Sequence, residues 1–219
     1  MRPYVFINVA ASLDGKISDE TRKQLKISCA EDLKIVDELR ANSDAIMVGI
    51  GTVLADDPRL TVKSAELRAM RVGQGKSPNP VRVIVDSKCR VPLDARVLND
   101  EAKTIVAVSK SANREKMKMV AEVAEVAVFG GRKVDLKLLL EYLYKTGIRK
   151  VMVEGGGTLI SSLISEKLVD EMRIYYAPMF IGGSSSPTIC DGRSEIVGCS
   201  IERIKKIGGG FAVHVKFNP

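Results

Sequence analysis

The segment KVMVEGGGTL, residues Lys150 to Leu159, combines a strand, a glycine turn and a helix start. Val151 and Val153 favour a short buried strand. The three glycines that follow let the backbone approach a ligand closely, because no Cβ stands in the way. Thr158 can cap the next helix, and free N–H groups at a helix start favour an anion. The segment therefore predicts an α/β unit, whose turn is either a plain connection or a cradle for a dinucleotide diphosphate.

Length and composition limit the classes of protein to consider. The 219 residues are 45% hydrophobic, which predicts a single domain spanning residues 1–219 with a sizeable core. No apolar run is long enough to cross a membrane, and the N-terminus lacks the layout of a signal peptide. We therefore expect a cytoplasmic protein without a membrane partner.

The cysteines and the single histidine bear on metal and redox chemistry. Cys29, Cys89, Cys190 and Cys199 are dispersed without a CxxC pair. This spacing favours free, buried thiols in a reducing compartment over disulfides. His214 is the only histidine, so no metal site is expected, and its alternating strand context favours a structural role.

The charge pattern argues against nucleic acid as a partner. The 34 basic and 27 acidic residues give a net charge of +7, but they are interspersed. The chain has no tryptophan and no basic stripe with interleaved aromatic residues. A mildly positive surface is instead suited to steering phosphorylated anions.

Strand and helix signals alternate along most of the chain. A capping box at Ser28 to Glu31 predicts a helix that ends near Asn42. The stretch from Ser64 to Pro80 is rich in charges, glycine and proline, which indicates an exposed loop. Further strands are expected at 4–9, 45–48, 81–85, 104–108, 126–129, 171–177, 200–207 and 211–217, with helices at 113–124 and 136–144. The fold class is α/β: a mixed, mostly parallel sheet flanked by helices, with a C-terminal antiparallel hairpin turning at 208–210.

Several polar or glycine-rich segments follow predicted strands. The strand ends at Gly49, Asp86, Gly130 and Glu154 should gather at one edge of the sheet, where open α/β sheets bind ligands. The loop from Ala10 to Ser18 also follows a strand; it is either a simple turn at Asp14-Gly15 or a cover for a cofactor.

Two charged segments allow both a structural and a functional interpretation. Asp56 and Asp57 are helix caps or solvated acids, unless one of them holds a polar group of a ligand. Ser87, Lys88 and Arg90 form either a polar turn or a small phosphate site, for example for a ribose 2′-phosphate. The residues alone leave these alternatives open.

Taken together and in this order, the segments resemble a known family. The likeness rests on Ser12 to Lys16, Leu39 to Ala41, Gly51 to Thr61, Val85 to Ser87 and Glu154 to Leu159. With these segments the chain resembles the pyrimidine reductases of riboflavin biosynthesis: the reductase half of the bacterial bifunctional deaminase-reductases and its stand-alone archaeal and fungal relatives. The resemblance implies a dihydrofolate-reductase-like fold and a homodimer. It also implies NADPH- or NADH-dependent reduction of a ribosylamino-pyrimidine 5′-phosphate to the ribitylamino compound.

The resemblance also implies site residues at matching positions. By the resemblance, the cofactor would be lined by Thr52, Asp56, Ser87, Gly155, Gly156, Gly157 and Thr158, and the substrate by Arg40, Leu60, Lys63 and Glu154. The residues themselves add Arg90 and Gly130 as candidates for the cofactor and Asn8 as a candidate for the substrate. The bacterial pattern has arginine at Lys63, and lysine keeps the charge without the bidentate geometry. Asp56 and Glu154 are the candidate donors of the proton that the reaction requires.

The choice of pyrimidine rests on two expectations. The chain lacks the zinc-deaminase signature, so the reductase is expected to act before deamination, on 2,5-diamino-6-ribosylamino-4(3H)-pyrimidinone 5′-phosphate. Asn8, expected at the end of the first strand, offers both a donor and an acceptor and can meet an exocyclic amine. The alternatives are a reductase of the deaminated pyrimidine, a folate-type reductase and a non-catalytic dinucleotide-binding module.

Overall fold

The computed structural model describes residues 1–23, 25–192 and 196–217. These residues form nine strands, six α-helices and one short 3-10 helix. The chain divides into two compact units. The first comprises Met1–Pro3 and Asp37–Met152, and the second comprises Tyr4–Val36 and Val153–Pro219.

The first unit is built on parallel strands with apolar, mostly buried residues. Its strand order is β5-β4-β3-β2-β6, and the pairs β2–β3, β3–β4 and β4–β5 are parallel. Such continuous Val/Ile runs are typical of strands covered on both faces. The strands are β2 (Ala45–Gly49), β3 (Val81–Val85), β4 (Thr104–Val108), β5 (Glu125–Val128) and β6 (Lys150–Val153), the last belonging to this unit through Met152.

Helices and a long loop cover these strands. Ile46, Ile84 and Val106 form one core cluster with residues of α2, α4 and the segment 89–98. Asn113 and Asp135 cap two of the helices, each by accepting a backbone N–H three residues on. The elements are α2 (Ile50–Asp56), α3 (Ala65–Gly73), the 3-10 helix Arg96–Leu98, α4 (Arg114–Ala121) and α5 (Leu136–Lys145).

The loop predicted between Ser64 and Pro80 is wrong in its first half, which forms α3. The Ser64 side chain caps this helix by accepting the N–H of Leu67. The buried guanidinium of Arg71 donates to the carbonyl oxygens of Ala41, Ser43 and Ser77. Composition suggested a loop because the residue that anchors this helix, Arg71, is charged. A charged residue in a polar stretch is normally expected to lie in solvent.

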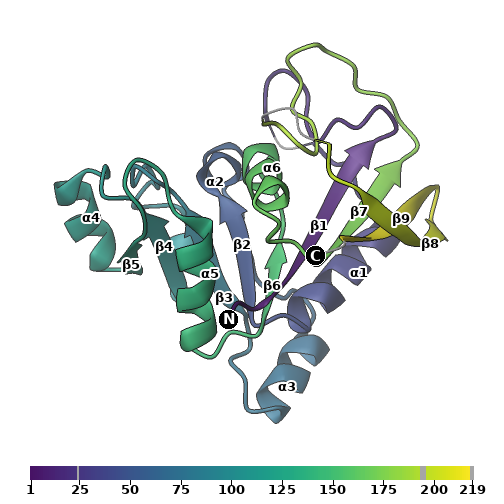
Figure 1. Cartoon of the computed structure of the whole chain (residues 1–219). Helices are drawn as coiled ribbons and strands as arrows, with labels where there is room; N and C mark the ends of the chain where they lie inside the picture. The colour runs from purple at the N-terminus through teal and green to yellow at the C-terminus, as the bar shows by residue number, and fades with distance from the viewer. Residues whose placement is uncertain (24, 193–195, 218–219) are drawn as a thin grey trace. The chain divides into compact units, whose positions relative to one another are not determined.

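The second unit combines a parallel pair with an antiparallel hairpin. Its strand order is β1-β7-β9-β8; β1 and β7 are parallel, and β9 is antiparallel to both β7 and β8. The hairpin β8–β9, yellow in Figure 1, turns at Gly208 with a φ of 54° and confirms the predicted turn. The elements are β1 (Tyr4–Ser12), α6 (Gly157–Ser165), β7 (Glu171–Ala177), β8 (Cys199–Ile207) and β9 (Gly210–Phe217).

Helix α1 (Ala30–Ala41) begins in the second unit and ends in the first. Its predicted position is confirmed, but the predicted cap is one residue off. The Sγ atom of Cys29, rather than the Ser28 hydroxyl, accepts the N–H of Asp32. Besides Ala41, the helix buries two acids, Asp32 and Asp37, and not the leucine and valine stripe that helical spacing suggests.

The expected α/β class, with mostly parallel strands, flanking helices and a C-terminal hairpin, is confirmed. The cysteines are free, but only Cys89 is buried, whereas Cys190 and Cys199 are exposed, which corrects the expectation of four buried thiols. Within the described ranges, no helix has the length and apolar character needed to cross a membrane. The same ranges contain no group of three or more His, Cys, Asp or Glu residues placed to hold a metal ion.

Candidate functional site

Ser87 and Gly130 meet at the carboxyl edge of the first unit. The Ser87 hydroxyl accepts the N–H of Val134, and its carbonyl accepts the hydroxyl of Ser109. The Gly130 carbonyl accepts the N–H of Lys110, so the turns after β3, β4 and β5 form one connected rim. This confirms that the strand ends at Gly49, Asp86 and Gly130 gather at one edge.

Gly130 has a reason of its own to be glycine. Its φ is 74°, and an added Cβ would lie 2.5 Å from the Lys133 carbonyl oxygen. Both features exclude an L side chain without a change in the loop. The loop geometry therefore explains this glycine whether or not a cofactor lies against it.

Arg90 follows a turn built on a buried carboxylate. Asp86 is fully buried, and its Oδ2 atom accepts the N–H groups of Arg90 and Val91. The exposed Arg90 guanidinium lies 3.8 Å from the other oxygen, Oδ1, measured at Nε. The Arg90 guanidinium thus lies beside Asp86, the residue that precedes Ser87, and remains largely exposed to solvent.

Helix α2 carries Thr52 and Asp56, both half-buried. Burial raises the pKa of the Asp56 carboxyl above its ordinary value. The neighbouring Asp57 ends the helix in a left-handed conformation, and its Oδ1 atom accepts the Arg96 N–H at 2.8 Å. Asp57 therefore has a structural role as a cap, whereas Asp56 is a half-buried carboxyl that remains available for chemistry.

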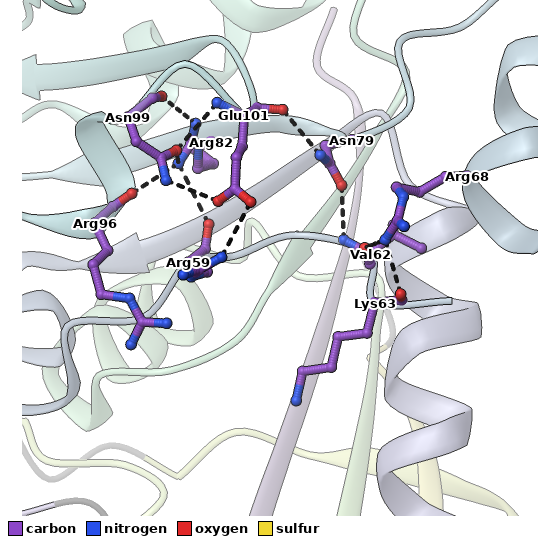
Figure 2. Close-up of polar contacts among 9 residues, drawn as sticks. All are labelled: Arg59, Val62, Lys63, Arg68, Asn79, Arg82, Arg96, Asn99 and Glu101. Carbon is purple, nitrogen blue, oxygen red and sulfur yellow. Dashed lines mark hydrogen bonds and ion pairs between the residues drawn. The ribbon is translucent and has the colours of Figure 1, made fainter. Parts of the chain in front are cut away.

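The segment from Arg59 to Ser64 carries two predicted substrate residues, Leu60 and Lys63. Leu60 is buried and has a φ of 51°, a strained conformation for a branched residue. The Lys63 side chain is exposed and extends away from the surrounding contacts (Figure 2). Arg40, the third predicted substrate residue in this unit, donates from Nη1 to the Thr61 carbonyl at 2.9 Å. The structure therefore joins Arg40 to the segment that carries the other two.

A buried arginine supports the start of this segment. Arg82, on β3, is fully buried and donates to the carbonyl oxygens of Arg59, Arg96 and Asn99 and to the Asn99 side chain (Figure 2). It also donates to the Ala102 carbonyl. Its Nε atom has no partner in the described part of the chain. One guanidinium thus ties the segment at Arg59 to the connection between β3 and β4, and no carboxylate of the described residues is hydrogen-bonded to it.

The glycine motif lies in the second unit, between β6 and α6. Gly155 and Gly156 have φ values of 145° and 89°, which L residues rarely adopt. Gly156 is the N-cap of α6 and no side chain caps the helix. The predicted cap is therefore wrong: Thr158 lies inside the first turn, because the helix begins two residues earlier than a cap at this threonine would place it. Glu154, half-buried, directly precedes these glycines.

The third glycine of the motif is packed against another segment. A Cβ on Gly157 would lie 2.5 Å from the Thr188 carbonyl oxygen and 3.1 Å from Asp191 Oδ2. The Gly157 carbonyl in turn accepts the N–H of Asp191. Part of the glycine requirement is thus internal packing, and an acid lies beside the helix start where an anion was expected.

The loop after β1 forms the predicted turn and is tied to the segment after β7. Asp14 accepts the Ser12 hydroxyl and the N–H groups of Ile181 and Gly182. These hydrogen bonds, the Ser12 bond foremost, lower the pKa of Asp14 to about 2. The Gly15 N–H also donates to the Ser12 carbonyl, which confirms the turn at Asp14-Gly15.

Asn8 lies in the middle of β1, not at its end as expected. The strand continues to Ser12 because β7 pairs with it over seven residues. Asn8 is 6% exposed, and its Oδ1 atom accepts a hydrogen bond from Arg173 Nη1 at 2.9 Å. Arg173 also forms an ion pair of 2.6 Å with Asp32, and both of these side chains are 1% exposed. Because an arginine can only donate, the amide orientation is fixed, and the free edge of Asn8 is its Nδ2 donor.

Sequence analysis missed the charged residues that support these sites. They are Asp32 and Asp37 on α1, Arg68 on α3, and Arg82 and Arg173 on strands. Each looks like ordinary surface charge on a helix or an interruption of an apolar strand. The one available signal was an arginine inside the otherwise apolar runs 81–85 and 171–177, since charges in a buried strand require partners.

Comparison with known proteins places the chain in a family. The family model described as the RibD C-terminal domain matches residues 3–213. The chain belongs to the RibD C-terminal domain family. A relative in Archaeoglobus fulgidus, named 2,5-diamino-6-ribosylamino-4(3H)-pyrimidinone 5′-phosphate reductase, is 71% identical over 218 residues, which cover 100% of both chains. A protein of the same name in Methanothermobacter thermautotrophicus is 53% identical, covering 88% of this chain and 85% of the relative.

Solved structures agree on the fold of this RibD C-terminal domain protein. The crystal structure of a pyrimidine reductase-like protein from Corynebacterium diphtheriae has a TM-score of 0.88 and covers 99% of this chain and 92% of its own. Its sequence identity of 19% makes it evidence for the fold alone. The close relatives are named reductases, and the chain is accordingly an oxidoreductase of riboflavin biosynthesis that requires a nicotinamide cofactor.

Proposed function

We propose that this protein reduces 2,5-diamino-6-ribosylamino-4(3H)-pyrimidinone 5′-phosphate to its ribitylamino form with NADPH as the preferred cofactor, in the cytoplasm. The observation that carries the proposal is the 71% identity to the Archaeoglobus fulgidus reductase, without a gap in coverage of either chain. The segments on which the family resemblance rests, which contain Thr52, Asp56, Glu154 and Gly155, also support it.

The residues present fit a dinucleotide cofactor. In the first unit, the rim of Ser87 and Gly130 lies close to the exposed Arg90 guanidinium. In the second unit, no side chain caps α6, so a diphosphate can be placed at this helix start on the side away from the Asp191 carboxylate, which lies beside Gly157. Thr52, Asp56, Ser87, Arg90, Gly130 and Gly155 to Thr158 are the residues we assign to the cofactor.

The chain would bind the substrate through Asn8, Arg40, Leu60, Lys63 and Glu154. A bound nicotinamide supplies the hydride that reduces C1′ of the ribosylamino group. The ring oxygen that leaves C1′ must then receive a proton. We assign this proton to Asp56 rather than Glu154, because burial keeps the Asp56 carboxyl protonated to a higher pH than an ordinary aspartate.

A turnover assay tests the proposal directly. Purified protein is mixed with NADPH or NADH and with the aminated or the deaminated ribosylamino-pyrimidine phosphate. Oxidation of the nicotinamide cofactor is followed by the loss of its absorbance. Turnover of the aminated compound with the higher kcat/KM supports the proposal. Preference for the deaminated compound, turnover of a dihydrofolate instead, or cofactor binding without turnover would each favour one of the alternatives.

Arg90 separates the two cofactors. We expect Arg90→Ala to weaken NADPH binding by about 1–3 kcal/mol through loss of a charge-assisted hydrogen bond, while NADH binding changes little. The measurement is the Kd of both cofactors by fluorescence titration. Lys145→Ala, a change at an exposed lysine in the last turn of α5, is the control. Equal losses for NADPH and NADH would remove Arg90 from the 2′-phosphate site.

Asn8 is expected to recognise a hydrogen-bond acceptor of the pyrimidinone. Asn8→Asp keeps an acceptor for Arg173 but turns the free donor edge into an acceptor. We expect kcat/KM for the aminated substrate to fall about 10-fold or more, in line with loss of one buried hydrogen bond, while thermal stability is maintained. An unchanged kcat/KM would show that the substrate does not meet this amide.

The same geometry revises how Asn8 can take part in substrate choice. Its acceptor is used by Arg173, so contact with an exocyclic amine would require the amide to turn over. Asn8→Lys would also place an ammonium beside a buried guanidinium, and we expect this variant to lose stability before it changes specificity.

A homodimer is part of the proposal. The edge strand β8 exposes Ile201 and Ile204, at 64% and 62%, and open strand edges pair readily with another chain. The expected result is a dimer mass in light scattering of the purified protein.

A further inference from the structure

The segment from Arg59 to Ser64 has no regular secondary structure, yet side chains hold its backbone at successive positions. Arg82 donates to the Arg59 carbonyl, and Arg40 donates to the Thr61 carbonyl. The Val62 N–H donates to Asn79 Oδ1 at 2.9 Å (Figure 2). Irregular segments normally satisfy these groups with water, so this one is unusually fixed.

The shortest of these hydrogen bonds involve the two peptide units that flank Lys63. Asp37 Oδ1 accepts the Lys63 N–H at 2.7 Å, and Oδ2 accepts the Ser64 N–H at 2.8 Å. Arg68 Nη1 donates to the carbonyl oxygens of Val62 and Lys63, both at 2.8 Å (Figure 2). We call Asp37 and Arg68 the Lys63 clamp.

The clamp leaves the Lys63 side chain itself free of the protein. Its ammonium forms no ion pair or hydrogen bond with any residue in the described ranges, and the side chain points away from Arg68 in Figure 2. Asp37, by contrast, is only 8% exposed, and burying a carboxylate is costly unless it is hydrogen-bonded. Two buried or half-buried charges thus fix the backbone of an exposed lysine, which is more than the fold requires of a surface loop.

We propose that Asp37 and Arg68 are positioning residues, which hold Lys63 for the phosphate monoester of the substrate. A lysine on a fixed backbone loses less conformational freedom on binding than one on a mobile loop, so the clamp increases affinity without touching the ligand. This inference rests on the proposed function, because it takes the substrate to be a 5′-phosphate.

The test compares the phosphorylated substrate with its dephosphorylated riboside. We expect Asp37→Asn to raise KM for the phosphorylated compound about 10-fold, the factor for one weakened charge-assisted contact, with kcat nearly unchanged. KM for the riboside should stay the same. Lys63→Ala should have the same selective effect, and adding Asp37→Asn to it should bring little further loss, because the two residues act as a unit.

Two further variants keep the test decisive. Arg68→Met removes the other half of the clamp and preserves helix propensity, so it gives the answer if Asp37→Asn does not fold. Asn113→Ala removes the cap of α4, away from the clamp, and controls for a general loss of stability.

The outcomes separate the two hypotheses. A rise of KM for both compounds alike, or a fall of kcat, would make the clamp merely structural and overturn the inference. If the wild type reduces neither compound, the proposed function fails; the clamp is then tested by titrating inorganic phosphate against the wild type, Lys63→Ala and Asp37→Asn. Equal phosphate binding by all three proteins would overturn the inference as well.

Discussion

Asp56→Asn is expected to lower kcat by about 10²–10⁴-fold, the range typical for loss of a general acid. The amide has nearly the same size and cannot donate the proton that the leaving ring oxygen needs. In the wild type, kcat should fall as the pH rises through the raised pKa of Asp56, because only the protonated carboxyl donates. The pH profile of kcat, measured for both proteins, should therefore lose this descending limb in the variant.

Stability gives a second measure of the same residue. The pKa of Asp56 is raised in the folded protein, so between its unfolded and folded pKa values the folded state binds more protons. Stability from this group is thus lost as the pH rises through the folded pKa. We expect Asp56→Asn to raise the melting temperature at pH 7 and to leave it unchanged near pH 3. Retained activity in a folded Asp56→Asn variant would transfer the role to Glu154 or to water.

Asp57→Asn is the matched control for this experiment. Asp57 lies next in the chain, but its Oδ1 atom caps the turn at Arg96, and an amide oxygen can accept the same hydrogen bond. We expect kcat within about two-fold of the wild type, as for a residue outside the transition-state contacts.

Arg82→Met is expected to destabilise the protein by about 3–5 kcal/mol, the range for breaking a buried charged network. Methionine fills much of the same space but leaves the carbonyl groups of Arg59, Arg96 and Asn99 without their donor. For a chain of this length, such a loss lowers the melting temperature by very roughly 6–20 °C. Thermal and urea unfolding of the variant and the wild type provide the measurement.

Arg59→Met controls for the loss of an arginine in the same region. Its side chain is 54% exposed and forms a surface ion pair of 3.2 Å with Glu101, which contributes at most about 1 kcal/mol. Comparable stability of the two variants would show that the Arg82 network does not hold the loops together.

The linear sequence determined the strands and most helices of this protein. Runs such as Val81–Val85 and Thr104–Val108 consist mainly of β-branched residues, with Arg82 as the one charged exception, so local propensity and burial mostly agree. Glycine and asparagine punctuation then fixed several boundaries, including the hairpin turn at Gly208 and the start of α4. The sequence also revealed two motifs, Thr52 to Asp57 and Glu154 to Thr158. Both were recognisable because their residues are contiguous in the chain.

Only the tertiary structure decided which charged residues are buried and what they hold. Asp37 lies on α1 among other charged residues, and its partners Lys63 and Ser64 are 26 and 27 positions away. Arg173 and its partners Asp32 and Asn8 are separated by 141 and 165 positions. A local pattern gives the period of a helix or strand, but it does not contain the distant acceptor that makes burial of a charge tolerable. The same limit explains why α3 was missed, since Arg71 stabilises it through carbonyl groups that belong to other segments of the chain.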